Sequence, residues 1–364
     1  MNEELIENSA EIVPAADIPS LVPGFKDMSL RVGLMMIVVF ATRCVCNVSL
    51  MLFSFSPLYI CWSEVGKTLT DSLAAIVFLN VIPITAGLLI LKFPLKSKLR
   101  QMYAKPRYFG RALGIFPAGY GMAMAVALIT MLVGRLFQGT AVEDSFNAVE
   151  NSLRTTDVPS ALIMFVHTAV LAPLFEEFWF RGLVLQSLRP YGNGFAIFVS
   201  AILFGFTHGN LQQVFYATAI GIVLGYVAVQ TESIVTTTVL HAMFNCIGGI
   251  SSLFLANYDV GEYILALELG VDIPKTPVVI AFIVWTVLVL SLAFIGFVMA
   301  VVKLVHIGRY RVPKMQTELS AKRRWGIFLS RPTVLIMLLM AIDTITVAFV
   351  TRKLFELFAI IFYG

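Results

Sequence analysis

The stretch that decides the fold is Pro173-Leu174-Phe175-Glu176-Glu177-Phe178-Trp179-Phe180-Arg181, where two adjacent acids and an arginine interrupt a strongly apolar run. The run extends from Ala161 to Leu188 and is long enough for a helix to cross the hydrocarbon core of a bilayer. Charged side chains are costly there, so they usually face the interior of a helix bundle and mark a functional site. The stretch therefore predicts a membrane-spanning helix that carries an internal polar site.

The composition of the whole chain agrees with this prediction. Hydrophobic residues make up 59% of the 364 residues and charged residues only 13%, well below the charged share of ordinary soluble domains. Apolar runs of helical length recur along the chain: Val32 to Ile60, Leu73 to Leu91, Ala112 to Phe137, Ala161 to Leu188, Phe195 to Gly209, Val214 to Val229, Ile234 to Phe254, Val278 to Leu304 and Thr333 to Val350. We therefore expect an all-α fold, a polytopic transmembrane helical bundle with eight or nine membrane spans.

The basic residues predict the orientation of the bundle. They cluster in two loops between apolar runs, at residues 92–111 and 309–331, and the positive-inside rule places such loops in the cytoplasm. Alternate threading of the spans then puts the N-terminus in the cytoplasm of a multi-pass cell-membrane protein. We expect a polar cytoplasmic segment over residues 1–31 and a single membrane domain over 32–364. The net charge of +4 does not predict nucleic-acid binding, because the basic residues lie in these loops.

Helix geometry separates the roles of the two acids. Glu177 and Arg181 are four residues apart and share one face of the helix, which predicts an ion pair. Glu176 lies about 140° from Arg181 around the helix, so its carboxylate stays free of that pair. A free carboxylate in an apolar interior can act as a general base or acid, and Glu176 is the candidate. For Glu177 and Arg181, a purely structural role explains the pattern equally well.

Two further spans carry histidines and an amide. His208 ends the fifth run, while His241 and Asn245 share one face of the seventh. The two imidazoles can bind a divalent metal such as zinc, with Glu176 and Asn245 nearby, or they can polarise a carbonyl without metal. An interhelical hydrogen bond would explain either histidine alone. At about 1.5 Å of rise per residue, however, all these groups fall at compatible depths near mid-membrane, which favours a common site.

These positions resemble the signatures of the CAAX-protease and bacteriocin-processing (CPBP/Abi) family of membrane peptidases. The pattern E-E-x-x-x-R runs from Glu176 to Arg181, F-x-x-x-H from Phe204 to His208, and H-x-x-x-N from His241 to Asn245. The three patterns occur in the family's order on successive hydrophobic helices, so their joint signal is strong although each alone is weak.

The resemblance implies both an activity and roles for these residues. It implies a peptidase-like core at about residues 159–255, in which Glu176 activates a water and His208, His241 and Asn245 complete the site. Glu177 and Arg181 would support it. The implied enzyme is a metallo- or glutamate-dependent endopeptidase that hydrolyses a membrane-associated peptide or protein among membrane lipids. The resemblance transfers no particular substrate and no oligomeric state.

Two other functions are compatible with the same residues. A non-catalytic immunity or scaffold protein of the same family would keep the motifs while binding a partner. A membrane transporter would also place acids and histidines at mid-membrane, although the chain shows neither internal repeats nor paired broken helices. Outside the motifs, Arg43 and Asp343 are further charged residues within spans; they could pair with each other, but nothing in the sequence fixes that contact.

Overall fold

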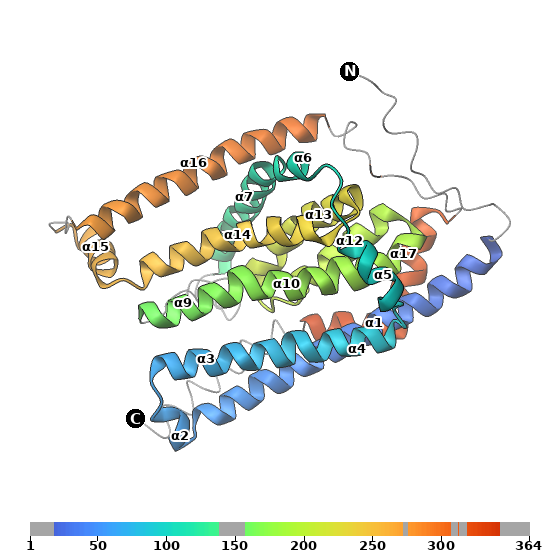
Figure 1. The fold of residues 1–364 in the computed structure, drawn as a ribbon, viewed down its shortest axis with the longest axis horizontal. Helices are drawn as coiled ribbons and strands as arrows, with labels where there is room; N and C mark the ends of the chain where they lie inside the picture. Colours follow the sequence, from blue (N-terminus) through green and yellow to red (C-terminus); the bar gives the residue numbers. More distant parts are fainter. Residues whose placement is uncertain (1–17, 138–156, 272–275, 307–311, 313–318, 343–364) are drawn as a thin grey trace.

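The computed structural model describes residues 18–137, 157–271, 276–306, 312 and 319–342, and this part of the chain is almost entirely helical (Figure 1). The main elements are α1 (Ile18–Ser54), α2 (Pro57–Ile60), α3 (Glu64–Ala75), η3 (Ile76–Val81), α4 (Ile82–Ile90), α5 (Leu95–Met102), α6 (Phe109–Leu113), α7 (Phe116–Gly134), α9 (Val158–Val166), η5 (His167–Leu171), α10 (Ala172–Glu177), η6 (Phe178–Val184), α11 (Leu185–Leu188), α12 (Asn193–Phe206), α13 (Leu211–Thr231), α14 (Ile234–Leu255), α15 (Tyr258–Leu269), α16 (Pro277–Val305) and α17 (Ala321–Leu329). No strand occurs among the described residues.

The helices confirm the predicted polytopic bundle. Within the described ranges, seven continuous helices are long and apolar enough to cross a membrane. Two consecutive helices, Ala321–Leu329 and Pro332–Ile342, form an eighth candidate that is bent by 74°. The proline at position 332 accounts for this bend, because the residue before a proline is disfavoured in the helical conformation. The chain is therefore a multi-pass membrane protein.

Some span boundaries differ from those predicted. The first helix begins well before Val32 and ends at Ser54, just ahead of the proline that opens α2. The fifth predicted run forms α12, whose 14 residues reach roughly 21 Å and fall short of the hydrocarbon thickness. The ninth predicted run, Thr333 to Val350, starts within the helix Pro332–Ile342, and its remainder lies outside the described residues.

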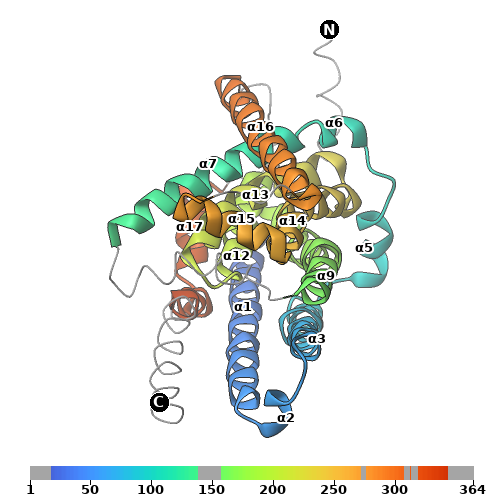
Figure 2. The same cartoon turned by 90° about the vertical axis from the view of Figure 1, so that its left-hand side faces the viewer.

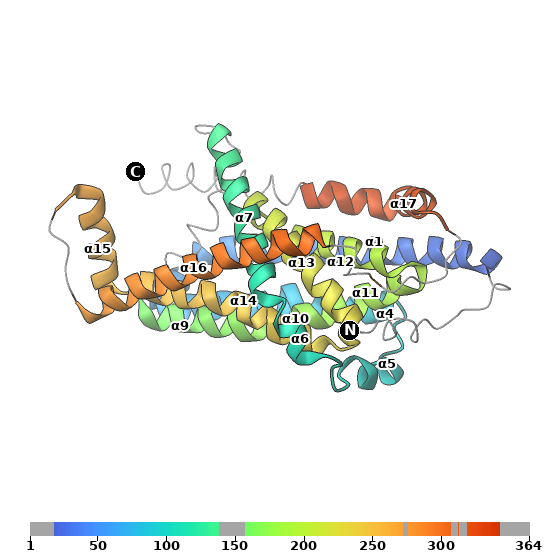
Figure 3. The ribbon, with the colours of Figure 1, turned by 90° about the horizontal axis from the view of Figure 1, so that it is seen from above.

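Most of the long helices lie along one axis of the molecule, and α15 crosses one end of the bundle (Figures 1 and 3). Neighbouring contacts run from α1 to α4, from α3 to α9, from α9 to α14 and from α14 to α13. The end-on view places α13 and α14 near the middle (Figure 2). In the most apolar window of α13, 56% of the residues are buried, against 6% for α16. Thus α13 is a central helix, and α16 presents most of its surface to lipid.

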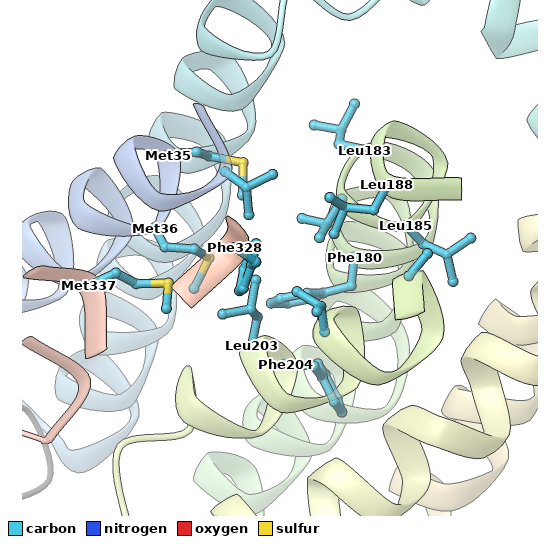
Figure 4. Close-up of a cluster of buried hydrophobic side chains, with 14 of the residues drawn as sticks. Met35, Met36, Phe180, Leu183, Leu185, Leu188, Leu203, Phe204, Phe328 and Met337 are labelled. Atoms are coloured by element: carbon cyan, nitrogen blue, oxygen red, sulfur yellow. The ribbon is translucent and has the colours of Figure 1, made fainter. Parts of the chain in front are cut away.

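The largest cluster of buried apolar side chains joins α1, η6, α11, α12 and the C-terminal helices (Figure 4). Met35 and Met36 of α1 face Phe180 and Leu183 of η6 across it. Lipid chains are as apolar as these side chains, so close packing rather than removal from water holds such a cluster together. This packing fixes one side of η6, the segment that directly follows the two adjacent acids.

Small residues let α12 and α13 approach each other closely. A Cβ atom on Gly221 would lie 2.9 Å from the Cα atom of Ala201, and one on Gly205 would lie 2.2 Å from Oγ1 of Thr218. A side chain at either glycine would force the two helices apart. Their close contact brings the main chain of α13 next to the polar residues of η6.

Candidate active site

The two adjacent acids lie between π-helical segments. Glu176 and Glu177 end α10, with η5 before it and η6 after it. Such segments are rare and often occur at functional sites, because an inserted residue loosens the regular main-chain hydrogen bonds. In η5, the carbonyl oxygen of Thr168 accepts a hydrogen bond of 2.7 Å from Nδ2 of Asn245. The irregular helix thus connects directly to a second motif residue.

Glu177 and Arg181 form the predicted ion pair. Nη1 of Arg181 lies 2.7 Å from Oε1 of Glu177, and neither side chain is exposed. Nη2 of Arg181 donates to the carbonyl oxygen of Gly221 at 3.2 Å, and the guanidinium lies 4.7 Å from the ring centroid of Phe204. These contacts offset part of the cost of burying the two charges. Arg181 therefore ties η6 to both α12 and α13.

His241 on α14 lies between the two acids. Its Nδ1 atom is 2.9 Å from Oε1 of Glu177, and its Nε2 atom is 3.7 Å from Oε2 of Glu176. Since a carboxylate only accepts hydrogen bonds, Nδ1 carries the hydrogen in this contact. A neutral imidazole has one N–H group, so Nε2 then presents its lone pair to Glu176. Glu177 thereby fixes the orientation of His241, and Glu176 is the acid that faces the other nitrogen of the imidazole.

Glu176 is the more accessible of the two acids. Its side chain is 25% exposed, whereas that of Glu177 is fully buried. Oε2 of Glu176 and Nε2 of His241 both accept hydrogen bonds, so a water about 2.8 Å from each could donate one hydrogen to each of them. The lone pairs of that water would then point away from both groups. The arrangement can therefore hold a water and take a proton from it.

His208 and Phe204 form a wall of the site next to His241. Nδ1 of His208 is 3.0 Å from the carbonyl oxygen of Phe204, to which it donates, and its Nε2 atom keeps the lone pair. The Phe204 ring meets the imidazoles of His208 and His241 edge-on, at centroid distances of 4.9 and 5.4 Å. The structure therefore brings the two predicted histidines to the same aromatic ring.

Asn245 lies one helical turn beyond His241 on α14. Its hydrogen bond to Thr168 joins α14 to η5, as polar side chains commonly do between membrane helices. An amide nitrogen has two hydrogens, so Asn245 can make this contact and still donate a second hydrogen bond. Its position next to His241 is therefore compatible with both packing and a role in the site.

Arg43 of α1 belongs to the site although it lies outside the three motifs. Its Nη2 atom donates to the carbonyl oxygen of His208 at 3.1 Å, and its charge interacts with that of Glu176. Asp343, with which Arg43 could pair according to the sequence, lies outside the described residues. The signal for Arg43 in the sequence is a single charge within a long apolar run, and this signal does not identify a partner.

The donors at this site include types that bind divalent metals. Both histidines have a hydrogen bond at Nδ1 and present Nε2, an arrangement typical of metal-bound histidine, and Glu176 can supply oxygen. Across the described residues, however, no three His, Cys, Asp or Glu side chains converge as a group that could hold an ion. The atom types thus suit a divalent metal, but the side chains do not converge on a common position. Metal binding stays a prediction.

The fold and the site together define a class: multi-pass helical membrane proteins with an enclosed acid–histidine centre. Residues 158–247 match the family described as "Type II CAAX prenyl endopeptidase Rce1-like". The match confirms the resemblance to the CAAX-protease and bacteriocin-processing family for this segment, which contains all seven residues of the three motifs: Glu176, Glu177, Arg181, Phe204, His208, His241 and Asn245.

One curated relative is the "Putative membrane peptidase YdiL" of Bacillus subtilis (strain 168). It is 29% identical over 98 residues, which amount to 26% of this chain and 40% of the relative. The matched region thus spans less than half of that relative's length. No solved structure gives a significant match to this chain.

Proposed function

We propose that this protein is an intramembrane endopeptidase of the CAAX-protease type, which hydrolyses a membrane-associated peptide or protein. The observation that carries the proposal is the 3.7 Å approach of Nε2 of His241 to Oε2 of Glu176, with Glu177 holding the other side of the imidazole. An accessible carboxylate, Glu176, that faces a second hydrogen-bond acceptor, Nε2 of His241, suits the activation of water. The family match over residues 158–247 supports a peptide bond as the target.

In the proposed reaction, Glu176 is the base. It takes a proton from the bound water as the water oxygen forms a bond to the scissile carbonyl carbon, and the carbonyl electron pair moves onto oxygen. Protonated Glu176 then gives its proton to the leaving nitrogen while the carbon–nitrogen bond breaks. The products are a carboxylic acid and an amine, so one water is consumed per bond.

The remaining motif residues stabilise the charge that develops on the carbonyl oxygen. Asn245 can donate its second amide hydrogen, and His208 can donate from Nε2 when that atom carries a proton. Glu177 and Arg181 act indirectly. They hold His241 in place and make contacts with α12 and α13.

Metal binding belongs to the same proposal. Nε2 of His208, Nε2 of His241 and the carboxylate of Glu176 are the groups that would hold a divalent ion such as zinc, and they would have to come closer together than they lie in this structure. When bound, such an ion would polarise the scissile carbonyl and make water more acidic.

The proposed location is the cell membrane, with the N-terminus in the cytoplasm. The substrate would reach the site from the cytoplasmic side or laterally between helices, since the orientation expected from the sequence would put the polar cluster at or slightly cytoplasmic of mid-membrane. The family description names prenyl endopeptidases, so a prenylated C-terminal peptide is the first substrate class to test.

The proposal is tested by comparing the protein termini in membranes from cells that express wild type, Glu176→Gln or Glu64→Gln. Glu64 is an exposed acid that pairs with Lys67 away from the site, so its variant is the matched control. We expect new termini with wild type and with Glu64→Gln, and their absence with Glu176→Gln. If Glu176→Gln instead supports every cellular phenotype of wild type, a non-catalytic scaffold is the better explanation.

A further inference from the structure

An arginine on the first transmembrane helix reaches the catalytic region from outside the matched segment. Arg43 lies within the candidate span Leu21–Ser54, and the family match begins only at residue 158. A guanidinium inside a bilayer is costly, so its presence calls for a compensating role. No carboxylate of the described residues lies within ion-pair distance of Arg43, although Asp27 forms such a pair with Arg31 on the same helix.

The contact of Arg43 falls on the turn that carries His208. Nη2 of Arg43 donates to the main-chain oxygen of His208 at 3.1 Å. The guanidinium also lies against Gly209, where an added Cβ would be 3.1 Å from its central carbon. Gly209 has a φ of +71°, in the left-handed region that favours glycine. Arg43 therefore supports the backbone at the point where the chain reverses between α12 and α13.

Arg43 also adds a positive charge near the two acids. Glu177 is paired with Arg181 at 2.7 Å, and both are buried. In the described part of the chain, Glu176 has no arginine within ion-pair distance; the arginine charges that act on it from farther away are Arg181 and, more weakly, Arg43. Opposite charges that do not touch still attract appreciably in surroundings of low dielectric constant. Arg43 is therefore a second arginine that attracts Glu176, and it comes from α1.

We propose that Arg43 is a positioning residue of the active site: it holds the His208–Gly209 turn in place and adds a positive charge that attracts Glu176. This inference rests on the proposed function. It extends the site to α1 and predicts that the matched segment depends on this helix for full activity. The two parts of the role are separable, since lysine keeps the charge but lacks the planar guanidinium fork.

The test measures kcat and KM for cleavage of a prenylated C-terminal peptide by the full-length protein in lipid, for wild type, Arg43→Gln and Arg43→Lys. Arg31→Gln is the matched control, because Nη1 of Arg31 also bridges two helices by donating to the carbonyl oxygen of Ile90 at 2.9 Å, away from the site. We expect Arg43→Gln to lower kcat by about 10- to 100-fold, as is typical when a supporting partner of a catalytic group is lost. We expect KM to change little, Arg43→Lys to recover part of the kcat lost in Arg43→Gln because it keeps the charge, and Arg31→Gln to keep most of the wild-type kcat.

Added guanidinium ion provides a second readout that does not depend on the folding of Arg43→Gln. In Arg43→Ala, millimolar guanidinium should restore part of the lost kcat, whereas it should not act on Arg31→Ala. Wild-type kcat in Arg43→Gln, or no restoration by either lysine or guanidinium, would overturn the inference. Loss of all cleavage in Glu176→Gln under the same conditions shows that the proposed function itself still holds.

Discussion

Oε1 of Glu177 is shared by two partners: it lies 2.9 Å from Nδ1 of His241 and 2.7 Å from Nη1 of Arg181. One oxygen atom thus fixes a histidine from α14 and an arginine from η6. When the imidazole is neutral, donation from Nδ1 leaves a lone pair on Nε2, the atom that faces Glu176. The relationship explains the adjacent acids: Glu177 organises the site, and Glu176 is left to react.

Replacing the organising acid should destabilise the protein as well as inactivate it. Glu177→Gln leaves the guanidinium of Arg181 buried without its counter-charge, and breaking a buried pair in this way typically costs about 3–5 kcal/mol. Thermal unfolding in detergent measures the effect. The control, Glu64→Gln, removes an exposed pair and should cost less than about 1 kcal/mol. Equal unfolding temperatures for the two variants would contradict the role of Glu177.

The contact between α12 and α13 makes a second prediction, which compares two glycines. In Gly221→Ala, the new Cβ would lie 2.9 Å from the backbone of Ala201, so the helices must separate and draw the carbonyl of Gly221 away from Arg181. We expect a loss of roughly 1–3 kcal/mol in stability, together with lower activity. Gly248→Ala on α14 meets no atom within 4 Å and should be tolerated. Similar stability of both variants would disprove the close-packing argument.

The aromatic wall predicts a separate effect on activity. Phe204→Leu keeps an apolar side chain but removes the ring that contacts Arg181, His208 and His241. Loss of the cation–π contact alone should cost about 0.5–2 kcal/mol, and the histidines should lose their fixed orientation. Phe198→Leu, at an exposed position on the same helix, is the control. Turnover should fall in the first variant only, and an equal fall in both would count against this wall.

Metal dependence can be decided on purified protein. If His208 and His241 bind zinc through Nε2, prolonged chelation should abolish cleavage, and stoichiometric zinc should restore it. His208→Ala should then bind less metal in equilibrium dialysis, which is a readout independent of cleavage. Full activity after chelation, with no metal detected by elemental analysis, would instead favour a site that uses Glu176 without metal.

The sequence predicts most of the helices and one contact of the site, for reasons that are local. Hydropathy identifies the spans because each must match the thickness of a bilayer. The pairing of Glu177 with Arg181 follows from their four-residue spacing, and the structure confirms it even though Arg181 lies in a π-helical segment.

The spacing of residues within one helix does not predict their contacts with other helices. Nothing local to Glu177 indicates that it binds His241, 64 residues later, and nothing near Arg43 indicates the carbonyl of His208, 165 residues away. Similarly, the sequence of η5 does not show that the oxygen of Thr168 accepts from Asn245. These contacts depend on how the helices pack, and packing depends on the close approaches at glycines such as Gly221.

The measurement that tests the central claim most directly is the turnover of a membrane-associated peptide by purified protein in lipid vesicles, with wild type and Glu176→Gln side by side. Glutamine keeps the shape of the side chain but is a very poor proton acceptor. Because general acid–base catalysis contributes about 10²- to 10⁴-fold, turnover should fall at least about 100-fold while the unfolding temperature stays close to that of wild type. Undiminished turnover by folded Glu176→Gln would contradict the assignment of Glu176 as the catalytic base.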